Sequence, residues 1–301
     1  MHKTRPHFRL DPQTELFRPT GSGCVRKMTC GLLAALAMSC AQAGPKHCGY
    51  WLHGKDMKDV DVRSLASLGA TDLFLNEHAF KAHAHADVES WIAKAHGAGL
   101  SIHIWMQAFY YGEWINPVKD GVPDLGLFDE KIKRAQSYAR IRGVSGIHFD
   151  YVRYPGTAYK TPGGAAAVSE FVRQAATRLH KTSPRIVVSV ALMPETTSSL
   201  RYYGQDYAVI SRYMDVVLPM IYKGNYKKAT PWIASTTEWY VKNSKGAKVW
   251  SGLQGYKSDE DTSPLPAPEI AADAESALKA GAAGVVIFRW GTANLIPFRK
   301  D

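Results

Sequence analysis

The sequence predicts an α/β fold, a single (β/α)8 or TIM barrel, on three observations. Short apolar runs rich in β-forming residues recur along the chain, and segments with helical periodicity lie between them. Eight such runs fall within roughly 250 residues, the usual size of one barrel. An open doubly wound sheet is the alternative, but it normally has a glycine-rich first turn, which residues 49–54 (GYWLHG) do not resemble.

Residues 1–43 are expected to be a leader outside this fold. The basic pair Arg26-Lys27 precedes the short apolar run 31–38, and an A-x-A sequence ends at Ala43. This pattern is typical of a cleaved secretory signal peptide, which predicts a periplasmic or secreted protein. The apolar run is too short to span a bilayer, so we expect no membrane segment in the mature protein.

Two details of the leader leave alternatives open. The polar stretch upstream of the signal is unusually long, so we expect translation to start near Val25 or Met28. Lipid modification of Cys40 is the alternative to cleavage after Ala43. Ala37, however, occupies a position where such signals usually have leucine.

Removing the leader changes the cysteine count and the charge. Cys24, Cys30 and Cys40 lie in the leader, so Cys48 is alone in the mature chain and no internal disulfide is expected. The remaining 258 residues carry 31 basic and 25 acidic side chains, which lowers the net charge from +10 to +6. No basic run of the kind that binds nucleic acid is present. An anionic or partly deacetylated polymer stays open as a partner.

The predicted elements alternate along residues 44–301, without a linker or a second domain. Four helices are indicated by apolar spacing and end signals: one capped by Asp87, one through Val168–Leu179, one from Thr230-Pro231 with Thr230 as its cap, and one from Pro268. The eight predicted strands lie at 49–52, 72–75, 101–106, 146–151, 186–191, 215–221, 248–253 and 284–288.

The ends of these strands carry aromatic, amide and charged side chains. In a (β/α)8 barrel the active site is built at the carboxyl ends of the strands. Rings and amides there suit a neutral, hydroxyl-rich ligand such as a sugar, although the tryptophans could instead fill the barrel. The predicted sugar-binding residues are Trp51, Asn76, Trp105, Gln107, His148, Arg153, Tyr154, Gln254, Arg289 and Trp290.

Asp150 is the main catalytic candidate, within residues 146–155 (GIHFDYVRYP). Alternation along the strand places His148 and Asp150 on the side that faces the barrel interior, with Ile147, Phe149 and Tyr151 on the outer side. A carboxyl group among aromatic rings loses solvent, which raises its pKa and favours a general acid. The alternative is a structural ion pair with Arg153.

Hydrolysis of a glycoside usually needs two carboxylates. Glu195 and Glu77 follow two other predicted strands and are the candidates for the second one. Substrate assistance, in which an acetamido group of the sugar attacks, is the alternative because it needs a single acid.

Five segments resemble one family. Residues 146–155 are similar to the fourth-strand signature of glycosyl-hydrolase-like barrels, which include exported bacterial polysaccharide hydrolases. Residues 203–207 with 215–222 resemble their fifth helix and sixth strand, and the Met-x-Tyr end of that strand is similar to family 18 chitinases. Residues 248–256 and 284–290 resemble their last two strands.

The resemblance implies roles for two residues. The strand-four aspartate of the family is its catalytic acid, which corresponds to Asp150, and the strand-six tyrosine lines the subsite of the reacting sugar, which corresponds to Tyr222. One position departs from the chitinases. They have a glutamate two residues after the last aspartate of their motif, where this chain has Val152.

Other catalytic chemistries fit the sequence less well. His78, His83 and His85 form a cluster, but the last histidine of the chain is His180, so the later strands supply no such ligand and we predict no metal or other cofactor. Cys48 precedes the first strand without a partner pattern, and the chain lacks a G-x-S-x-G elbow.

We therefore expect an exported, monomeric glycoside hydrolase that acts on a polysaccharide, which could contain amino sugars. The alternative is a carbohydrate-binding barrel without turnover, which would need only the aromatic strand ends and one acid.

Overall fold

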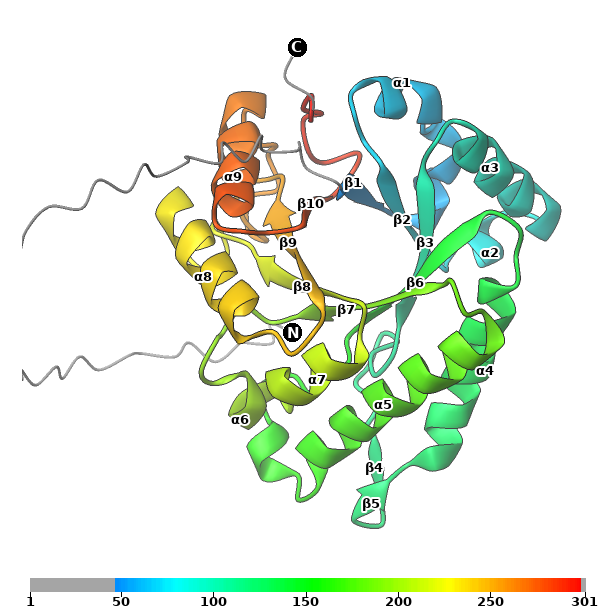
Figure 1. Ribbon diagram of the computed structural model, residues 1–301, viewed down its shortest axis with the longest axis vertical. Helices are drawn as coiled ribbons and strands as arrows, with labels where there is room; N and C mark the ends of the chain where they lie inside the picture. Colours follow the sequence, from blue (N-terminus) through cyan, green and yellow to red (C-terminus); the bar gives the residue numbers. More distant parts are fainter. Residues whose placement is uncertain (1–46, 299–301) are drawn as a thin grey trace, which may run out of the picture. The chain divides into compact units, whose positions relative to one another are not determined.

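The computed structural model describes residues 47–298, and the predicted leader with Cys24, Cys30 and Cys40 lies outside them. Within the described residues, eight parallel strands form a closed barrel in the order β1-β10-β9-β8-β7-β6-β3-β2 (Figure 1). The helices surround this barrel. The predicted (β/α)8 fold is confirmed, and the open doubly wound sheet is excluded because the first strand pairs with the last.

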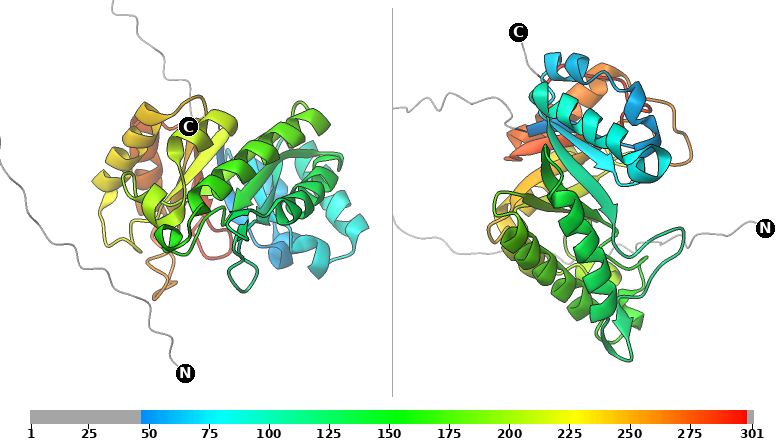
Figure 2. Two further views of the ribbon diagram at one scale, coloured as in Figure 1. Left: turned by 90° about the horizontal axis from the view of Figure 1, so that it is seen from below. Right: turned by 90° about the vertical axis from the view of Figure 1, so that its right-hand side faces the viewer.

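All eight predicted strands are present, with ends shifted by at most two residues. A short hairpin of β4 (Val118–Lys119) and β5 (Val122–Pro123) was not predicted, and it projects from the barrel beside α4 (Figure 2). The barrel strands are β1 (His47–Leu52), β2 (Asp72–Asn76), β3 (Ser101–Gln107), β6 (Val144–Asp150), β7 (Val187–Leu192), β8 (Val216–Ile221), β9 (Lys248–Gln254) and β10 (Gly284–Phe288).

The helices cover the outer face of the barrel. Several begin at aspartates whose side chains accept backbone N–H groups of the first turn, as Asp61, Asp124 and Asp206 do. The helices are η1 (Gly54–Asp59), α1 (Val62–Ser67), α2 (Ala79–Ala82), α3 (His85–Gly97), α4 (Leu125–Ala139), η2 (Ala158–Lys160), α5 (Gly164–Thr182), α6 (Ser199–Tyr203), α7 (Tyr207–Tyr213), α8 (Thr230–Asn243) and α9 (Ala267–Lys279).

Two predicted helix caps were wrong. Asp87 does not cap α3, which begins two residues earlier; its carboxylate instead pairs with Lys58 at 2.7 Å. The helix predicted from Thr230-Pro231 does begin at Thr230, as α8, but Thr230 is not its cap, because its hydroxyl donates to Asp273 at 2.7 Å. Both side chains therefore have tertiary partners that replace local capping.

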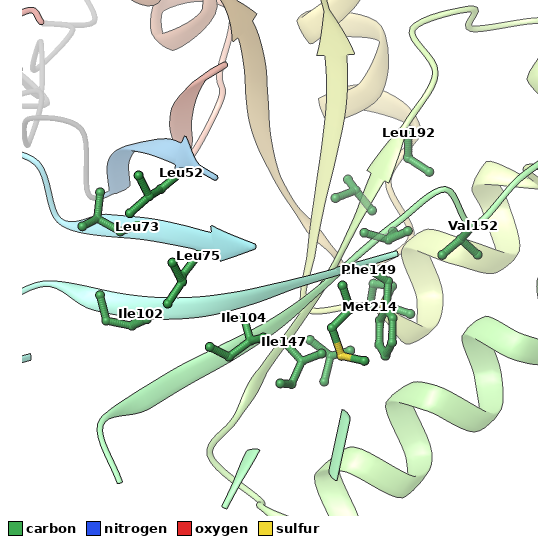
Figure 3. Packing of buried hydrophobic residues seen from close by; sticks show 14 of the residues in the cluster. Leu52, Leu73, Leu75, Ile102, Ile104, Ile147, Phe149, Val152, Leu192 and Met214 are labelled. Carbon is green, nitrogen blue, oxygen red and sulfur yellow. The ribbon is translucent and has the colours of Figure 1, made fainter. Parts of the chain in front are cut away.

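The larger part of the core lies between the strands and the helices. Aliphatic residues of neighbouring strands, including Leu75, Ile104 and Ile147, lie together in this layer (Figure 3), and buried helix residues belong to the same cluster. Cys48 belongs to this layer and is 1 % exposed. Burial raises the pKa of its thiol to about 12.

The barrel interior is filled by rings from several strands. Trp51, Phe74, Trp105 and Trp250 form a separate cluster there, and Phe74 stacks on His103 with ring centroids 4.6 Å apart. Gly252 makes this packing possible, since a Cβ atom at that position would lie 2.9 Å from the Trp51 ring. The interior is therefore solid below the carboxyl ends of the strands, as expected for a barrel of this size.

At the opposite, amino-terminal end of the barrel, Asp72 is the centre of a buried polar cluster. Its carboxylate accepts hydrogen bonds from His103 Nε2 at 2.9 Å, from the ring of His47 at 3.0 Å and from Thr71 Oγ1 at 2.6 Å. Burial alone would raise the pKa of Asp72, but the bonds from the two histidines lower it to about 2. This cluster lies away from the carboxyl ends of the strands, where barrel enzymes have their active sites, and contributes to stability.

Among residues 47–298, no helix combines the length and the apolar character that crossing a membrane requires.

Candidate active site

A pocket of about 720 Å³ opens at the carboxyl ends of the barrel strands. This volume lies in the range of small-ligand sites. All eight barrel strands, or the loops that follow them, contribute to its wall. The structure brings together seven of the predicted site residues here, namely Trp51, Asn76, Trp105, Gln107, Asp150, Arg153 and Tyr222.

Asp150 is the last residue of β6, and its side chain is 8 % exposed. Its Oδ2 accepts the indole N–H of Trp105 at 3.1 Å, and its Oδ1 accepts the backbone N–H of Tyr151 at 2.6 Å. Burial raises the pKa of Asp150 and outweighs the charge of Arg153 and the two hydrogen bonds, which lower it. The group is therefore a fixed carboxyl whose protonated form burial favours.

Tyr151 turns the chain away from the strand. Its φ of 54° lies in the left-handed region, which costs a residue other than glycine about 1–2 kcal/mol. This turn breaks the strand alternation, so that Tyr151 lines the pocket beside Asp150. Sequence alternation had placed Tyr151 on the outer side, and that expectation was wrong.

An aromatic rim formed by Tyr110, Trp114 and Tyr151 adjoins the pocket. The Tyr110 and Tyr151 rings stack with centroids 4.8 Å apart, and Trp114, 37 % exposed, meets Tyr151 edge to face at 5.7 Å. The Arg153 guanidinium lies 4.9 Å from the Trp114 ring and 5.1 Å from the Tyr151 ring. Arg153 makes no ion pair with Asp150 and contacts these rings instead. The alternative of a structural ion pair between the two residues is therefore excluded.

Tyr222 lies just past β8 and stacks on Phe288 with ring centroids 5.6 Å apart. Burial raises the pKa of its hydroxyl well above 10, and the charge of Asp150 adds to the effect. At neutral pH the hydroxyl is therefore a hydrogen-bond donor in the pocket wall.

The wall formed by the first strands has a different character. His53 lines it beside Lys55 and His78. Burial, and next the nearby charge of Arg289, lower the pKa of His53 to about 4, so its ring is neutral near pH 7. A neutral imidazole can donate and accept a hydrogen bond at once, as a sugar hydroxyl requires.

The two candidates for the second carboxylate do not line the pocket. Glu77 is 5 % exposed and faces α4, where Arg134 Nε lies 3.1 Å from its Oε2 and the Gln107 N–H donates to its Oε1 at 3.3 Å. Glu195 accepts the hydroxyls of Tyr203 and Tyr226 on Oε1 at 2.9 and 2.8 Å. Both carboxylates are thus held by partners within the protein.

Five predicted sugar-binding residues also lie outside the pocket lining. His148 is fully buried in the barrel interior, where its Nδ1 bonds to Ser189 Oγ at 2.9 Å. Tyr154 donates its hydroxyl to Asn116 at 2.8 Å, and Arg289 pairs with Asp56 at 3.4 Å. Trp290 packs against the outer core, and Gln254 bonds to the loop that follows β8. Position after a strand therefore does not ensure that a side chain faces the mouth.

The structure adds pocket residues that the sequence did not single out, above all Asp259 and Asn225. Asp259 lies five residues past β9 within the acidic run 259–261 (DED), which resembles an ordinary solvated loop. The one sequence feature that could have indicated Asp259 as a pocket residue is its position after a predicted strand.

The described residues contain no group of three His, Cys, Asp or Glu side chains that could hold a metal ion. Of the predicted histidine cluster, His83 bonds to the carbonyl of Gly54 and His85 contacts Phe80, while His78 lines the pocket.

Comparison with known proteins connects this site to a family. A family model described as "Putative glycosyl hydrolase domain" matches residues 78–247, more than half of the chain. The chain belongs to this family. The matched region includes Asp150, Arg153 and Tyr222, and it ends before β9. No curated protein matches the chain.

Solved structures with the same fold include several glycosidases. A class V chitinase from Pseudomonas fluorescens aligns with a TM-score of 0.64 at 13 % identity, over 85 % of this chain and 98 % of that one. The spore cortex-lytic enzyme SleL of Bacillus cereus aligns with a TM-score of 0.62 at 12 % identity, over 84 % and 72 %. A GH18 chitinase from Cycas revoluta aligns at 0.60 and 11 %, over 82 % and 95 %. At these identities the likeness shows the barrel fold alone.

Proposed function

We propose that this member of the glycosyl hydrolase family is an exported enzyme that cleaves glycosidic bonds of a polysaccharide, with Asp150 as the general acid. The observation that carries the proposal is the environment of Asp150. Its carboxyl is nearly buried, faces the pocket and is fixed by Trp105 and Tyr151. Burial raises its pKa, as a proton donor at neutral pH requires.

The chemistry follows from this placement. As the glycosidic bond breaks, its electron pair passes to the leaving oxygen, and that oxygen takes the proton of Asp150. The anomeric carbon bonds in turn to the oxygen of water, either directly or after attack by an acetamido group of the sugar. The resulting carboxylate is stabilised by the indole N–H of Trp105, the backbone N–H of Tyr151 and the charge of Arg153, all of which favour the ionised form. Burial therefore favours the protonated acid before the step, while the two N–H donors and Arg153 support its anion afterwards.

The pocket wall fits a sugar. Tyr222 and Trp105 present rings, while Asn76 and Gln107 present amides that can bond to hydroxyls. The aromatic rim (Tyr110, Trp114 and Tyr151) extends this surface beyond the pocket and would hold a further sugar of a polymer. Because several fold neighbours are chitinases, an amino-sugar polymer is the first substrate class to test.

Export rests on the leader sequence. The basic pair, the apolar run and the A-x-A site support cleavage after Ala43, with lipid modification at Cys40 as the alternative. The barrel of residues 44–301 would then act in the periplasm or outside the cell as a single domain and a monomer.

The test is release of reducing ends from a panel of chitin oligosaccharides, peptidoglycan and biofilm polysaccharides. We expect the wild-type barrel to hydrolyse one class, and Asp150→Asn to lose about 10²- to 10⁴-fold in rate. Asp120→Asn removes the same charge from the exposed hairpin turn and serves as the matched control. Circular dichroism establishes that both variants are folded. Undiminished turnover by Asp150→Asn would refute the assignment.

A binding protein without turnover is the second candidate. It is favoured by one observation, namely that neither Glu77 nor Glu195 lines the pocket. Calorimetry with the same glycans distinguishes the two functions. Binding to wild-type protein without any release of reducing ends would support the second candidate.

A further inference from the structure

Asp259 is the other carboxylate of the pocket. Among the described residues that line the pocket, the aspartates are Asp150 and Asp259, and no glutamate is present. Asp259 reaches the pocket from the loop that follows β9, and its side chain is exposed to solvent. The pocket therefore contains a pair of carboxylates, although neither glutamate predicted from the sequence belongs to it.

The loop that carries Asp259 is fixed by a chain of hydrogen bonds. The backbone N–H of Asp259 donates to Asn225 Oδ1 at 2.9 Å, and Tyr256 Oη donates to its Oδ1 at 3.0 Å. Gln254 holds Asn225 in turn: its Nε2 donates to the same Asn225 oxygen at 2.8 Å, and its Oε1 accepts the Asn225 N–H. These bonds position Asp259 without occupying both of its oxygens.

A glycine brings the two supporting loops together. A Cβ atom at Gly224 would lie 1.7 Å from the carbonyl oxygen of Lys257, so a side chain at this position would separate the loops that follow β8 and β9. The close approach allows Asn225 on one loop to hold Asp259 on the other. The position of Asp259 at the pocket thus depends on the close approach of these two loops.

The two carboxylates approach the pocket from different sides. β6, which ends in Asp150, and β9, which precedes Asp259, are separated by β7 and β8 in the closed barrel of eight strands. Tyr222 follows β8, between them. Burial is the main cause of its raised pKa, and the charges of both Asp150 and Asp259 contribute. The hydroxyl of Tyr222 is therefore close enough for the charges of both Asp150 and Asp259 to act on it.

We propose that Asp259 is the general base of an inverting hydrolysis in which Asp150 is the acid, an inference that rests on the proposed function. A water molecule between Asp259 and the sugar gives one proton to Asp259 while its oxygen bonds to the anomeric carbon. The glycosidic bond breaks in the same step, and its electron pair leaves with the outgoing oxygen, which takes the proton of Asp150. Asp259 then releases its proton to solvent, and Asp150 regains one.

The placement favours a base over a nucleophile. Inverting enzymes keep their carboxylates far enough apart for a water molecule, whereas retaining enzymes need the second carboxylate in contact with the sugar carbon. A carboxylate on an exposed loop, whose strand is separated by two others from the strand that carries the buried acid, has access to solvent water. Asp259 has this access, while Asp150 is protected from it.

The experiment uses the mature barrel and the glycan of the panel that the wild-type protein hydrolyses. We expect Asp259→Asn to lower the rate about 10²- to 10⁴-fold, while Glu260→Gln, the neighbouring exposed carboxylate outside the pocket lining, keeps the wild-type rate. Proton NMR of the first product should show an inverted anomeric configuration. The acidic limb of the pH–rate profile should disappear in Asp259→Asn, because the base sets that limb.

Azide provides a separate readout. Added to Asp259→Asn, it should replace the activated water, restore turnover and give a glycosyl azide of inverted configuration. A retained configuration, or Asp259→Asn with a rate within tenfold of wild type, would overturn the role of Asp259 and leave the proposed function intact. Failure of the wild-type protein to hydrolyse any glycan, or full activity of Asp150→Asn, would instead overturn the proposed function and this inference with it.

Discussion

The indole of Trp105 donates its N–H to Oδ2 of Asp150 across 3.1 Å. Trp105 is 5 % exposed and belongs to the ring cluster that fills the barrel interior. One oxygen of the candidate acid is therefore held by the core of the fold and not by a flexible surface group. Core packing and the chemistry of the site are coupled through this one bond.

Trp105→Phe should slow hydrolysis about tenfold and move the alkaline limb of the pH–rate profile to higher pH. The lost bond lowers the pKa of Asp150 in the wild-type protein, so its removal raises that pKa and keeps the acid protonated further into the alkaline range. Trp250→Phe removes a similar volume from the interior without a bond to Asp150 and should leave the limb unmoved. Equal shifts of the alkaline limb in both variants would contradict the coupling of Asp150 to the core through Trp105.

Arg153→Met should move the same limb in the same direction. The positive charge of Arg153 lowers the pKa of Asp150, and methionine retains part of the packing against Trp114 and Tyr151. Arg201→Met removes an exposed arginine that contacts Tyr159 and Tyr202 outside the pocket, and it serves as the control. An alkaline limb that moves to lower pH in Arg153→Met would show that the arginine acts through another group.

Glu195→Gln should keep activity within about tenfold of wild type, because an amide oxygen can still accept the hydroxyls of Tyr203 and Tyr226. Steady-state kinetics should show a change in KM, through the pocket residue Tyr226, larger than any change in kcat. A thousandfold loss in kcat would mean that Glu195 is the second carboxylate after all, in place of Asp259.

Asp72→Asn should destabilise the fold by about 2 kcal/mol at neutral pH, with little effect on the pH–rate profile. The pKa of Asp72 in the folded protein, about 2, lies below its usual value near 3.8. The stabilisation from its ionised form is thus complete above pH 4 and is lost as the pH falls towards 2. Urea unfolding of both proteins across this range should show curves that converge at low pH. A difference in the free energy of unfolding that stays constant with pH would contradict the link between ionisation of Asp72 and stability.

Thiol titration tests the processing of the leader. The full chain has four cysteines, and cleavage after Ala43 would leave Cys48 alone. A protein cleaved after Ala43 should show one thiol in denaturant and none when folded, because burial keeps Cys48 protonated and inaccessible. A mass increase with the same thiol count would indicate lipid modification at Cys40 instead of plain cleavage.

The barrel could be predicted because each strand is a short apolar run of its own. The sequence also predicted Asp150 and Tyr222 as pocket residues, since Asp150 ends β6 and Tyr222 directly follows β8 in segments that resemble the family. They failed where a side chain is directed by a tertiary partner. Glu77 turns outward because Arg134 on α4 lies beside it, and Tyr151 turns inward because its backbone adopts a left-handed conformation.

Asp259 shows the other limit of sequence reasoning. Nothing in its local sequence distinguishes it from Glu260 or Asp261, which share the same exposed loop. Its place in the pocket depends on Asn225, a residue from a different strand end. Such a contact is visible only once the two loops have been brought together in three dimensions.

The closure of the barrel also determines when the first strand can complete its pairing during folding. His47 at the start of β1 pairs with Gly284 at the start of β10, so the first strand has no complete set of neighbours until the last one exists. Contacts between residues so distant in sequence form late and slow folding. The barrel therefore cannot close before β10 has been synthesised, and the proposed export as an extended polypeptide would use the chain in this form.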